Sequence, residues 1–180
     1  MSKIGRRPIN IGGVSIEIKD GEIHYKGKKA SGTYAVPDTL TVQLEEKNIF
    51  LKPARKSHDI NKVWGLNRAL LANALKGADV GFEKQLRIVG LGFKAVAKGN
   101  QLQFSLGFSH KIDFPLDKSV TVDIDKTGQL LTFKSFDKGI LGLECSRVRA
   151  LRLPEPYKGT GIQYADEVII RKAGKAKAAA

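Results

Sequence analysis

Residues 115–133, PLDKSVTVDIDKTGQLLTF, decide the fold because they repeat the pattern of residues 37–51, PDTLTVQLEEKNIFL. Each stretch begins with a proline, reaches a Thr-Val pair, and alternates apolar and polar residues on either side of a turn. Alternation over strand-length runs, with Gly, Asp or Asn between them, is typical of β-hairpins. The same hairpin pattern occurring twice indicates that the chain contains two similar halves.

The repeat extends outward from these hairpins on both sides. An alternating strand pattern precedes each proline, and a helix-like run follows each hairpin. The offset between matching positions drifts from 78 residues at the prolines to 82 at a Lys-Gly pair, as small loop insertions would produce. We therefore predict a tandem duplication and an α+β fold, in which each half is a small, mostly antiparallel sheet packed with one helix. The matched positions are 22–26 and 101–105, Pro37 and Pro115, Arg68 and Arg149, and Lys76 and Lys158.

The two expected helices each carry one apolar face. The first is expected to start at the cap residue Asp59 and to end near Lys76, where Gly77 would terminate it. The second is expected to start at Asp137. Cys145, the one cysteine of the chain, falls on the second apolar face, so we interpret it as a core residue rather than as a reactive thiol. The apolar positions are Ile60, Val63, Trp64, Leu71, Ala74 and Leu75 in the first helix, and Leu141, Cys145, Val148 and Leu151 in the second.

The order of these elements predicts three segments. Residues 1–82 form a first repeat domain with a basic N-terminal arm, and residues 83–171 form a second repeat domain. Residues 172–180 are expected to be a basic, flexible tail, because a run of lysine and alanine is too polar to pack.

Positive charge is the strongest compositional signal. The 180 residues carry a formal net charge of +13 and an isoelectric point near 9.9, while 42% of them are hydrophobic and can supply a core. Such an excess makes a polyanion, most commonly nucleic acid, the expected partner. No run approaches the roughly 20 apolar residues of a membrane-spanning helix, no secretory signal is recognised, and a single cysteine excludes an intrachain disulfide. The composition predicts a soluble, intracellular, polyanion-binding protein.

Residues 154–162, PEPYKGTGI, form the most distinctive loop. Two prolines stop the preceding helix and favour extended backbone, while two glycines allow left-handed turns. Tyr157 and Lys158 lie between them, as a ring that can stack on a base and an ammonium group that can reach a phosphate. Taken alone, the loop is also consistent with a helix stop that carries a solvated lysine. The charge of the whole chain favours RNA.

Other basic residues gather near this loop and at both ends of the chain. Each phosphate that they neutralise should steepen the salt dependence of binding, and arginine can also chelate a phosphate or stack on a base. The lysines at residues 26–29 are interpreted as a solvated face. The clusters are Arg147, Arg149 and Arg152 at the end of the second helix; Arg171, Lys172, Lys175 and Lys177 in the tail; and Lys3, Arg6 and Arg7 as a secondary basic arm.

No motif indicates catalysis, a metal site or a cofactor. Residues 90–95, GLGFKA, match a dinucleotide-binding fingerprint, but that fingerprint requires a helix to follow, and residues 96–105 continue as a strand pattern. The three histidines lack the paired ligands of a zinc site. Ser109 and His110 are neighbours in an expected extended segment, so their side chains should point to opposite faces and cannot form a nucleophile–base pair.

With these residues in view, the chain resembles the bacterial large-subunit ribosomal protein L6 family over nearly its whole length. The most specific match is PEPYKG at residues 154–159, and the other matches follow in the right order. They are residues 2–9 (SKIGRRPI), 90–95 (GLGFKA), 106–110 (LGFSH), Tyr164 with Glu167, and 172–175 (KAGK).

The resemblance implies a non-enzymatic protein of the large ribosomal subunit in the cytoplasm, with two similar α+β domains and no cofactor. It implies binding to large-subunit ribosomal RNA mainly through the second domain, near the sarcin–ricin loop where translation factors dock. Neighbouring ribosomal proteins and those factors are the other expected partners, and no membrane is involved. Together with the charge pattern, it gives these expected RNA contacts: Lys94, Ser109, His110, Lys111, Arg149, Arg152, Tyr157, Lys158, Arg171, Lys172, Lys175 and Lys177.

The chain departs from the family pattern near the loop. Lysine is usual where Thr160 stands and arginine where Gln163 stands, so two expected phosphate contacts are missing. Residues 139–145 and Leu153 also differ from the usual residues. These departures concern individual contacts and leave the resemblance intact.

Two alternatives to a ribosomal role follow from the same residues. A generic basic nucleic-acid-binding module would bind many RNAs or DNAs and lose affinity almost uniformly with any lysine. An enzyme using the turn at residues 90–92 is disfavoured by the strand pattern after it. In the first domain, Arg68 and Lys76 lack a neighbouring Pro-Tyr element, so we expect them to be weak RNA contacts or none.

Overall fold

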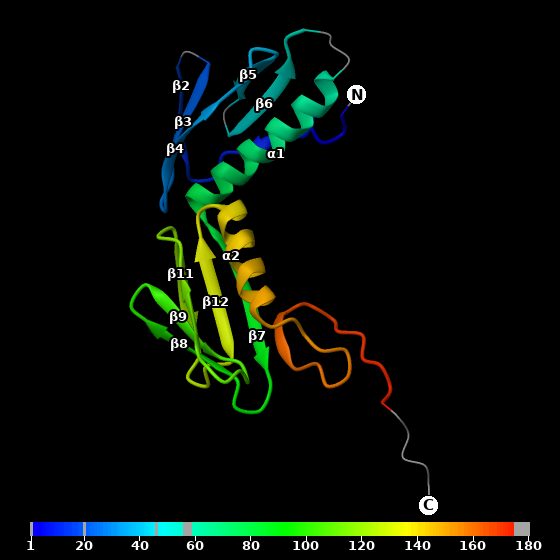
Figure 1. Ribbon diagram of the computed structural model, residues 1–180. Helices are drawn as coiled ribbons and strands as arrows, with labels where there is room; N and C mark the ends of the chain where they lie inside the picture. The colour runs from blue at the N-terminus through cyan, green and yellow to red at the C-terminus, as the bar shows by residue number, and fades with distance from the viewer. Residues whose placement is uncertain (1, 20, 46, 56–58, 175–180) are drawn as a thin grey trace, which may run out of the picture. The chain divides into compact units, whose positions relative to one another are not determined.

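The computed structural model describes residues 2–19, 21–45, 47–55 and 59–174 (Figure 1). The chain divides into two compact units, Met1–Phe82 with Phe136–Lys138, and Glu83–Ser135 with Gly139–Ala180. Each unit contains small antiparallel sheets and one helix, which confirms the predicted α+β class. Residues 175–180 of the predicted tail lie outside the described residues.

The first unit combines two three-stranded sheets with helix α1. One sheet has the strand order β1-β6-β5 and the other β2-β3-β4, and neighbouring strands run antiparallel. The elements are β1 (Ile9–Asn10), β2 (Ser15–Lys19), β3 (Glu22–Lys26), β4 (Ser31–Ala35), β5 (Leu40–Glu45), β6 (Asn48–Pro53) and α1 (Ile60–Asp79).

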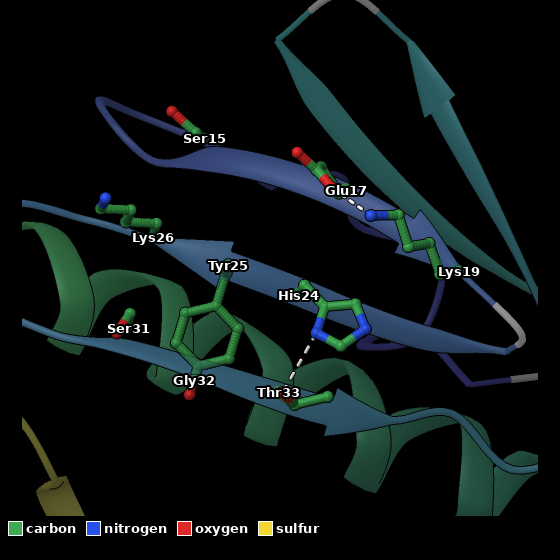
Figure 2. Close-up of a pocket in the computed structure, with 9 residues that line it drawn as sticks. All are labelled: Ser15, Glu17, Lys19, His24, Tyr25, Lys26, Ser31, Gly32 and Thr33. Atoms are coloured by element: carbon green, nitrogen blue, oxygen red, sulfur yellow. Dashed lines mark hydrogen bonds and ion pairs between the residues drawn. The ribbon is translucent and has the colours of Figure 1, made fainter.

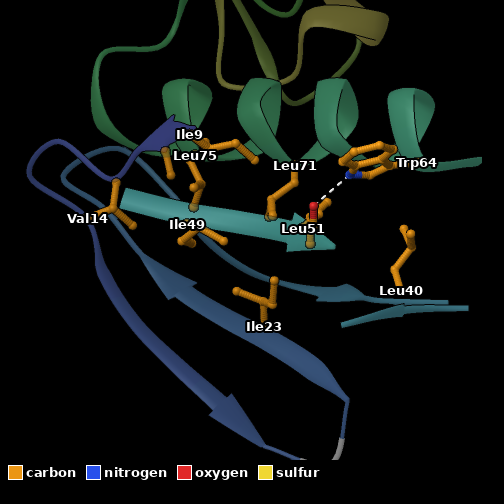
Figure 3. Packing of buried hydrophobic residues seen from close by; sticks show 10 residues of the cluster. Ile9, Val14, Ile23, Leu40, Ile49, Leu51, Trp64, Leu71 and Leu75 are labelled. Atoms are coloured by element: carbon orange, nitrogen blue, oxygen red, sulfur yellow. Dashed lines mark hydrogen bonds between the residues drawn. The ribbon is translucent and has the colours of Figure 1, made fainter. Parts of the chain in front are cut away.

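Helix α1 covers β6 and closes the core of the first unit (Figure 3). Trp64, Leu71 and Leu75 recur on one face of α1 and are buried in one cluster with Ile49 and Leu51 of β6. The Trp64 indole Nε1 donates a 2.6 Å hydrogen bond to the Leu51 carbonyl, which satisfies the one polar atom of this buried ring. The predicted apolar face is confirmed, although its other members, Ile60, Val63 and Ala74, are only half-buried.

Helix α1 ends later than the sequence predicts. It spans Ile60–Asp79, so Gly77 is a buried position inside it and not its terminator. The helix ends at Asp79, and Gly81 follows the C-cap residue Val80 with a φ of 79°, which suits glycine, and with its amide donating to the Lys76 carbonyl at 3.1 Å. Asp59 stands at the N-cap position, but its side chain makes no capping hydrogen bond. The prediction was wrong because glycine serves close packing as well as helix termination, and only the first of these applies at position 77.

The second unit contains a four-stranded sheet, β11-β12-β7-β13, a three-stranded sheet, β10-β9-β8, and helix α2, which runs alongside β12 and β7 (Figure 1). The predicted stripe on α2 is confirmed at Leu141, Cys145 and Val148, whereas Leu151 is half-buried and the buried Glu144 was not predicted. The elements are β7 (Phe82–Val89), β8 (Lys94–Lys98), β9 (Gln101–Ser105), β10 (Ile112–Pro115), β11 (Val120–Ile124), β12 (Leu130–Ser135), α2 (Lys138–Leu151) and β13 (Gly161–Tyr164).

The two units repeat the same hairpin down to single hydrogen bonds. Thr41 lies opposite Lys52 in the β5–β6 pair, and Thr121 lies opposite Lys134 in the β11–β12 pair. In each pair the threonine Oγ1 donates to the carbonyl of the opposite lysine, at 3.2 and 3.4 Å. A shared register turns equivalent side chains toward each core. This agrees with the predicted duplication.

Candidate nucleic-acid interface

The loop at residues 154–160 leaves the end of α2 and returns as β13. Its chain reverses in a turn in which the Gly159 amide donates to the Glu155 carbonyl at 2.9 Å. The prediction of an extended run is therefore wrong beyond Glu155, because Gly159, with a φ of 74°, lets the chain turn back directly after Lys158. The reversal leaves Tyr157 at the tip with 54% of its surface exposed.

Hydrogen bonds on two sides brace this loop. The Glu155 amide donates to the Thr160 carbonyl at 2.9 Å, and the Thr160 Oγ1 donates to the Glu155 carboxylate at 2.8 Å. The Lys172 amide donates to the Pro156 carbonyl at 2.8 Å. Thr160 therefore closes the loop instead of offering a cation. A loop that is already ordered pays less conformational entropy when it binds.

A second loop, residues 106–110, bends sharply where the sequence predicts an extended segment for Ser109 and His110. Gly107, with a φ of 76°, permits the bend. The rings of Phe108 and His110 stack with their centroids 6.2 Å apart, and both residues are exposed. The loop therefore presents an aromatic pair that the sequence did not reveal.

The turn at residues 90–93 packs against this second loop. Strand β8 begins directly after the turn, which confirms that the dinucleotide fingerprint lacks its helix. A Cβ added at Gly90 or Gly107 would lie 2.6 or 2.8 Å from the Phe93 ring, so both glycines are needed for its close packing. Lys94 follows Phe93 in the chain, and its side chain is exposed.

Arg149 makes an internal ion pair. Its Nε and Nη2 donate to the two carboxylate oxygens of Glu167 at 2.9 and 2.5 Å, and the Glu167 carboxylate also accepts the Tyr164 amide at 3.1 Å. The side chains of Arg149 and Glu167 are 27% and 23% exposed. The hydrogen bond from Arg149 lowers the pKa of Glu167, and the same bond raises the pKa of Arg149. Arg149 thus ties the segment after β13 to helix α2.

We expect Glu167→Gln to lower the free energy of unfolding at pH 7 by about 1–2 kcal/mol, because the variant cannot form the charged bidentate pair. Since the folded-state pKa of Glu167 is lowered, the stabilisation by the pair is complete above the ordinary glutamate pKa of about 4.3 and fades as the pH falls below it. Urea unfolding at pH 7 and pH 3 measures both effects. A difference between variant and wild type that stays constant over this range would contradict the assignment.

The structure exposes most of the residues predicted to bind RNA. Arg149 and Arg152 are half-buried and have internal partners, and Lys175 and Lys177 lie outside the described residues. Arg171 lies close to the loop, because its Nη2 is 3.0 Å from a Cβ added at Gly159. The exposed residues are Lys94, Ser109, His110, Lys111, Tyr157, Lys158, Arg171 and Lys172.

The predicted basic arm is a folded part of the first unit. Gly5 packs on the Trp64 ring, which leaves no room for a Cβ there. Arg68 of α1 donates to the Arg7 carbonyl at 3.2 Å and to the Pro8 carbonyl at 2.7 Å. Lys3, Arg6 and Arg7 remain exposed on this folded segment.

The first unit also has a polar hollow on the face of the β2-β3-β4 sheet (Figure 2). His24 Nδ1 lies 3.2 Å from the Thr33 hydroxyl, and Glu17 pairs with Lys19 at 2.8 Å. Ser15 and Ser31 also line the hollow, but Figure 2 shows both pointing away from His24. The arrangement does not assemble a serine nucleophile with its base.

Other chemical sites receive no support from the described part of the chain. No group of three or more His, Cys, Asp or Glu residues there could hold a metal ion. None of its helices is long and apolar enough to cross a membrane. Cys145 is fully buried, and burial raises the pKa of its thiol to about 11. The interpretation of Cys145 as a core residue is confirmed.

Comparison with known proteins gives one consistent family. A family model described as "Ribosomal protein L6" matches residues 89–165, which include both loops and the 90–93 turn. The large ribosomal subunit protein uL6 of Anaeromyxobacter dehalogenans is 42% identical over 180 residues, covering 99% of this chain and all of the relative. Proteins of the same name from Bartonella henselae and Rhodospirillum rubrum are 40% and 38% identical over 178 residues, covering 98% of this chain and all of each relative.

Proposed function

Because the chain belongs to the ribosomal protein L6 family, a structural and non-enzymatic component of the large ribosomal subunit, we propose that it binds large-subunit ribosomal RNA through one end of its second unit. The observation that carries the proposal is the braced loop at residues 154–160, which holds Tyr157 and Lys158 out to solvent. An exposed ring suits stacking on an unpaired base, and a lysine beside it suits a phosphate.

The other exposed basic residues extend this surface. Lys94, Lys111, Arg171 and Lys172 belong to the same unit as the loop, and Lys172 is joined to it by a backbone hydrogen bond. Ser109 and His110 add polar groups on the second loop. Lysine and arginine would neutralise phosphates, while the two ordered loops would fit the shape of the RNA.

We place the RNA site near the sarcin–ricin loop, on the basis of the resemblance to the bacterial family. Neighbouring large-subunit proteins are then its protein partners, and translation factors would dock close by. The mixed polar and basic surface of the second unit is compatible with such a crowded, RNA-rich setting.

The test is binding of the full chain to a transcript of bacterial large-subunit ribosomal RNA, with small-subunit ribosomal RNA as the matched control. We expect at least a tenfold preference for the large-subunit transcript, and an affinity that falls steeply with salt because phosphate neutralisation releases counterions. Equal binding to both transcripts would support a generic basic RNA-binding module instead.

The first unit should contribute little to this binding. Arg68 is occupied with the Arg7 and Pro8 carbonyls, and Lys76 lies 5.7 Å from the centroid of the Phe82 ring. We expect Arg68→Ala and Lys76→Ala to change RNA affinity less than about twofold, whereas Lys158→Ala weakens it about tenfold. Filter binding of the three variants measures this. An effect at Arg68 or Lys76 as large as at Lys158 would show that both units bind RNA.

A further inference from the structure

Arg152 lies at the end of helix α2 and contacts two other segments, the 90–93 turn and the 106–110 loop. Its guanidinium Nη1 donates a 2.8 Å hydrogen bond to the Leu106 carbonyl. Its Cζ lies 5.1 Å from the centroid of the Phe93 ring and 5.0 Å from that of the Phe108 ring. One side chain therefore joins the helix, the 90–93 turn and the 106–110 loop.

The backbone of Arg152 also belongs to this junction. Its carbonyl accepts the Ile162 amide at 2.8 Å, which ties the end of α2 to β13 directly after the 154–160 loop. Arg152 is thus connected to the 90–93 turn, to the 106–110 loop and to β13, which follows the 154–160 loop.

The packing around the guanidinium leaves it little freedom. A Cβ added at Gly107 would lie 2.8 Å from the Phe93 ring and 3.6 Å from Arg152 Nη1. Phe93 is only 9% exposed, and Arg152 is half-buried. A planar guanidinium can contact aromatic rings and donate to a carbonyl at once, whereas a compact ammonium cannot reproduce this whole arrangement.

We infer that Arg152 is a positioning residue, which holds Phe108 and His110 in the orientation that RNA meets, and that it does not itself bind a phosphate. This inference rests on the proposed function and revises the expectation drawn from charge alone. Phe108 is the link, because its ring lies 5.0 Å from Arg152 Cζ and also stacks on the exposed His110 ring, 6.2 Å away.

Two substitutions separate the shape of Arg152 from its charge. Arg152→Lys keeps the charge and removes the planar group, while Arg152→Met removes both. If Arg152 positions the loop, both variants should weaken binding to the large-subunit transcript about tenfold. Their log–log salt slopes should match that of wild type, because the number of neutralised phosphates stays the same.

Lys158→Ala serves as the reference for a side chain that neutralises a phosphate, and it should lower the salt slope by about 0.7–0.9. Wild-type affinity in Arg152→Lys, together with a lowered slope in Arg152→Met, would overturn the inference and show that Arg152 binds a phosphate. Wild-type affinity in both variants would overturn it as well. A wild-type chain without preference for large-subunit RNA would instead be a failure of the proposed function.

Side-chain NMR of the free protein tests the positioning role without RNA. In Arg152→Lys, the ring-current shifts between the stacked Phe108 and His110 rings should be lost, while the amides of β7 keep their wild-type exchange rates. Unchanged ring shifts would overturn the inference whatever the RNA result. Retained exchange protection in β7 also confirms that the variant is folded.

A double-mutant cycle gives a second line of evidence. Because Arg152 acts through Phe108, the effects of Arg152→Met and Phe108→Leu on RNA affinity should be non-additive. The double variant should bind RNA at most about twofold more weakly than either single variant. Arg152→Met with Lys172→Ala, on a separate segment, should be additive. Additive effects in the first pair would contradict the inference.

Discussion

Replacing Lys94, Lys158 and Lys172 together by alanine is expected to weaken binding to large-subunit ribosomal RNA about a thousandfold near 100 mM salt, roughly tenfold for each phosphate that is no longer neutralised. All three side chains are exposed in the second unit, on the segment after the 90–93 turn, on the braced loop, and on the stretch of chain bonded to that loop. The log–log salt slope should fall by about 2–3. Filter binding at several salt concentrations measures both quantities.

The matched control removes the same charge from the first unit. Lys26, Lys28 and Lys29 are exposed at and after the end of β3, and we interpret them as a solvated face. Their triple alanine variant should keep RNA affinity within about fivefold of wild type, since only long-range attraction is reduced. If both triple variants lose affinity and slope equally, binding follows net charge and the second unit has no special surface.

Gly161→Ala should cause the largest decrease in stability, about 3–4 kcal/mol in the second unit. Gly161 has a φ of 142°, and an added Cβ would lie 2.6 Å from the Leu153 carbonyl oxygen and 2.8 Å from the Pro154 Cα. These are backbone atoms, which cannot move aside as a side chain can. Gly161 also begins β13 opposite Val89 of β7, so relief of the clash would break the strand pairing that anchors the loop.

The chain offers its own reporter for this experiment. Trp64, the only tryptophan, lies in the core of the first unit, so its fluorescence follows that unit alone, while circular dichroism follows both. In Gly161→Ala, the urea midpoint by fluorescence should stay unchanged and part of the dichroism signal should disappear at lower urea.

Gly142→Ala is the control for this substitution. Gly142 lies inside α2, and nothing approaches an added Cβ within 4 Å. Alanine there should raise stability by about 0.5–1 kcal/mol, because it favours the helix. A destabilisation by Gly142→Ala as large as that by Gly161→Ala would mean that backbone clash is not the cause.

The repeated hairpins could be predicted because their signal is local. Residues 41–44 and 121–124 alternate between apolar and polar side chains, and this alternation alone is enough to predict a strand. The Thr-Val pair that both stretches share has the same register in both units. The short strand β1 carries few residues of pattern, and its partner, β6, lies far along the chain. The end of α1 was misplaced for a related reason, since the role of Gly77 depends on what packs against it.

The exposed lysines of the candidate site could be predicted from the sequence, but the internal contacts of its arginines could not. Exposure of Lys94, Lys158 and Lys172 follows from their polarity, and the structure bears it out. The roles of Arg149 and Arg152 depend on Glu167 and on the Leu106 carbonyl, which are 18 and 46 residues away. Spacing in a single sequence carries no signal for such pairs, so the sequence could not predict that Arg149 and Arg152 have internal hydrogen-bond partners.

Sedimentation of the protein from a cell lysate, first at moderate and then at high salt, tests the ribosomal RNA-binding role most directly. We expect the wild-type chain to travel with the large ribosomal subunit at moderate salt and to leave it as salt screens the phosphates. The Lys94, Lys158 and Lys172 triple variant should leave at lower salt than the first-unit control. A wild-type chain that sediments as a small free protein at moderate salt would contradict this role.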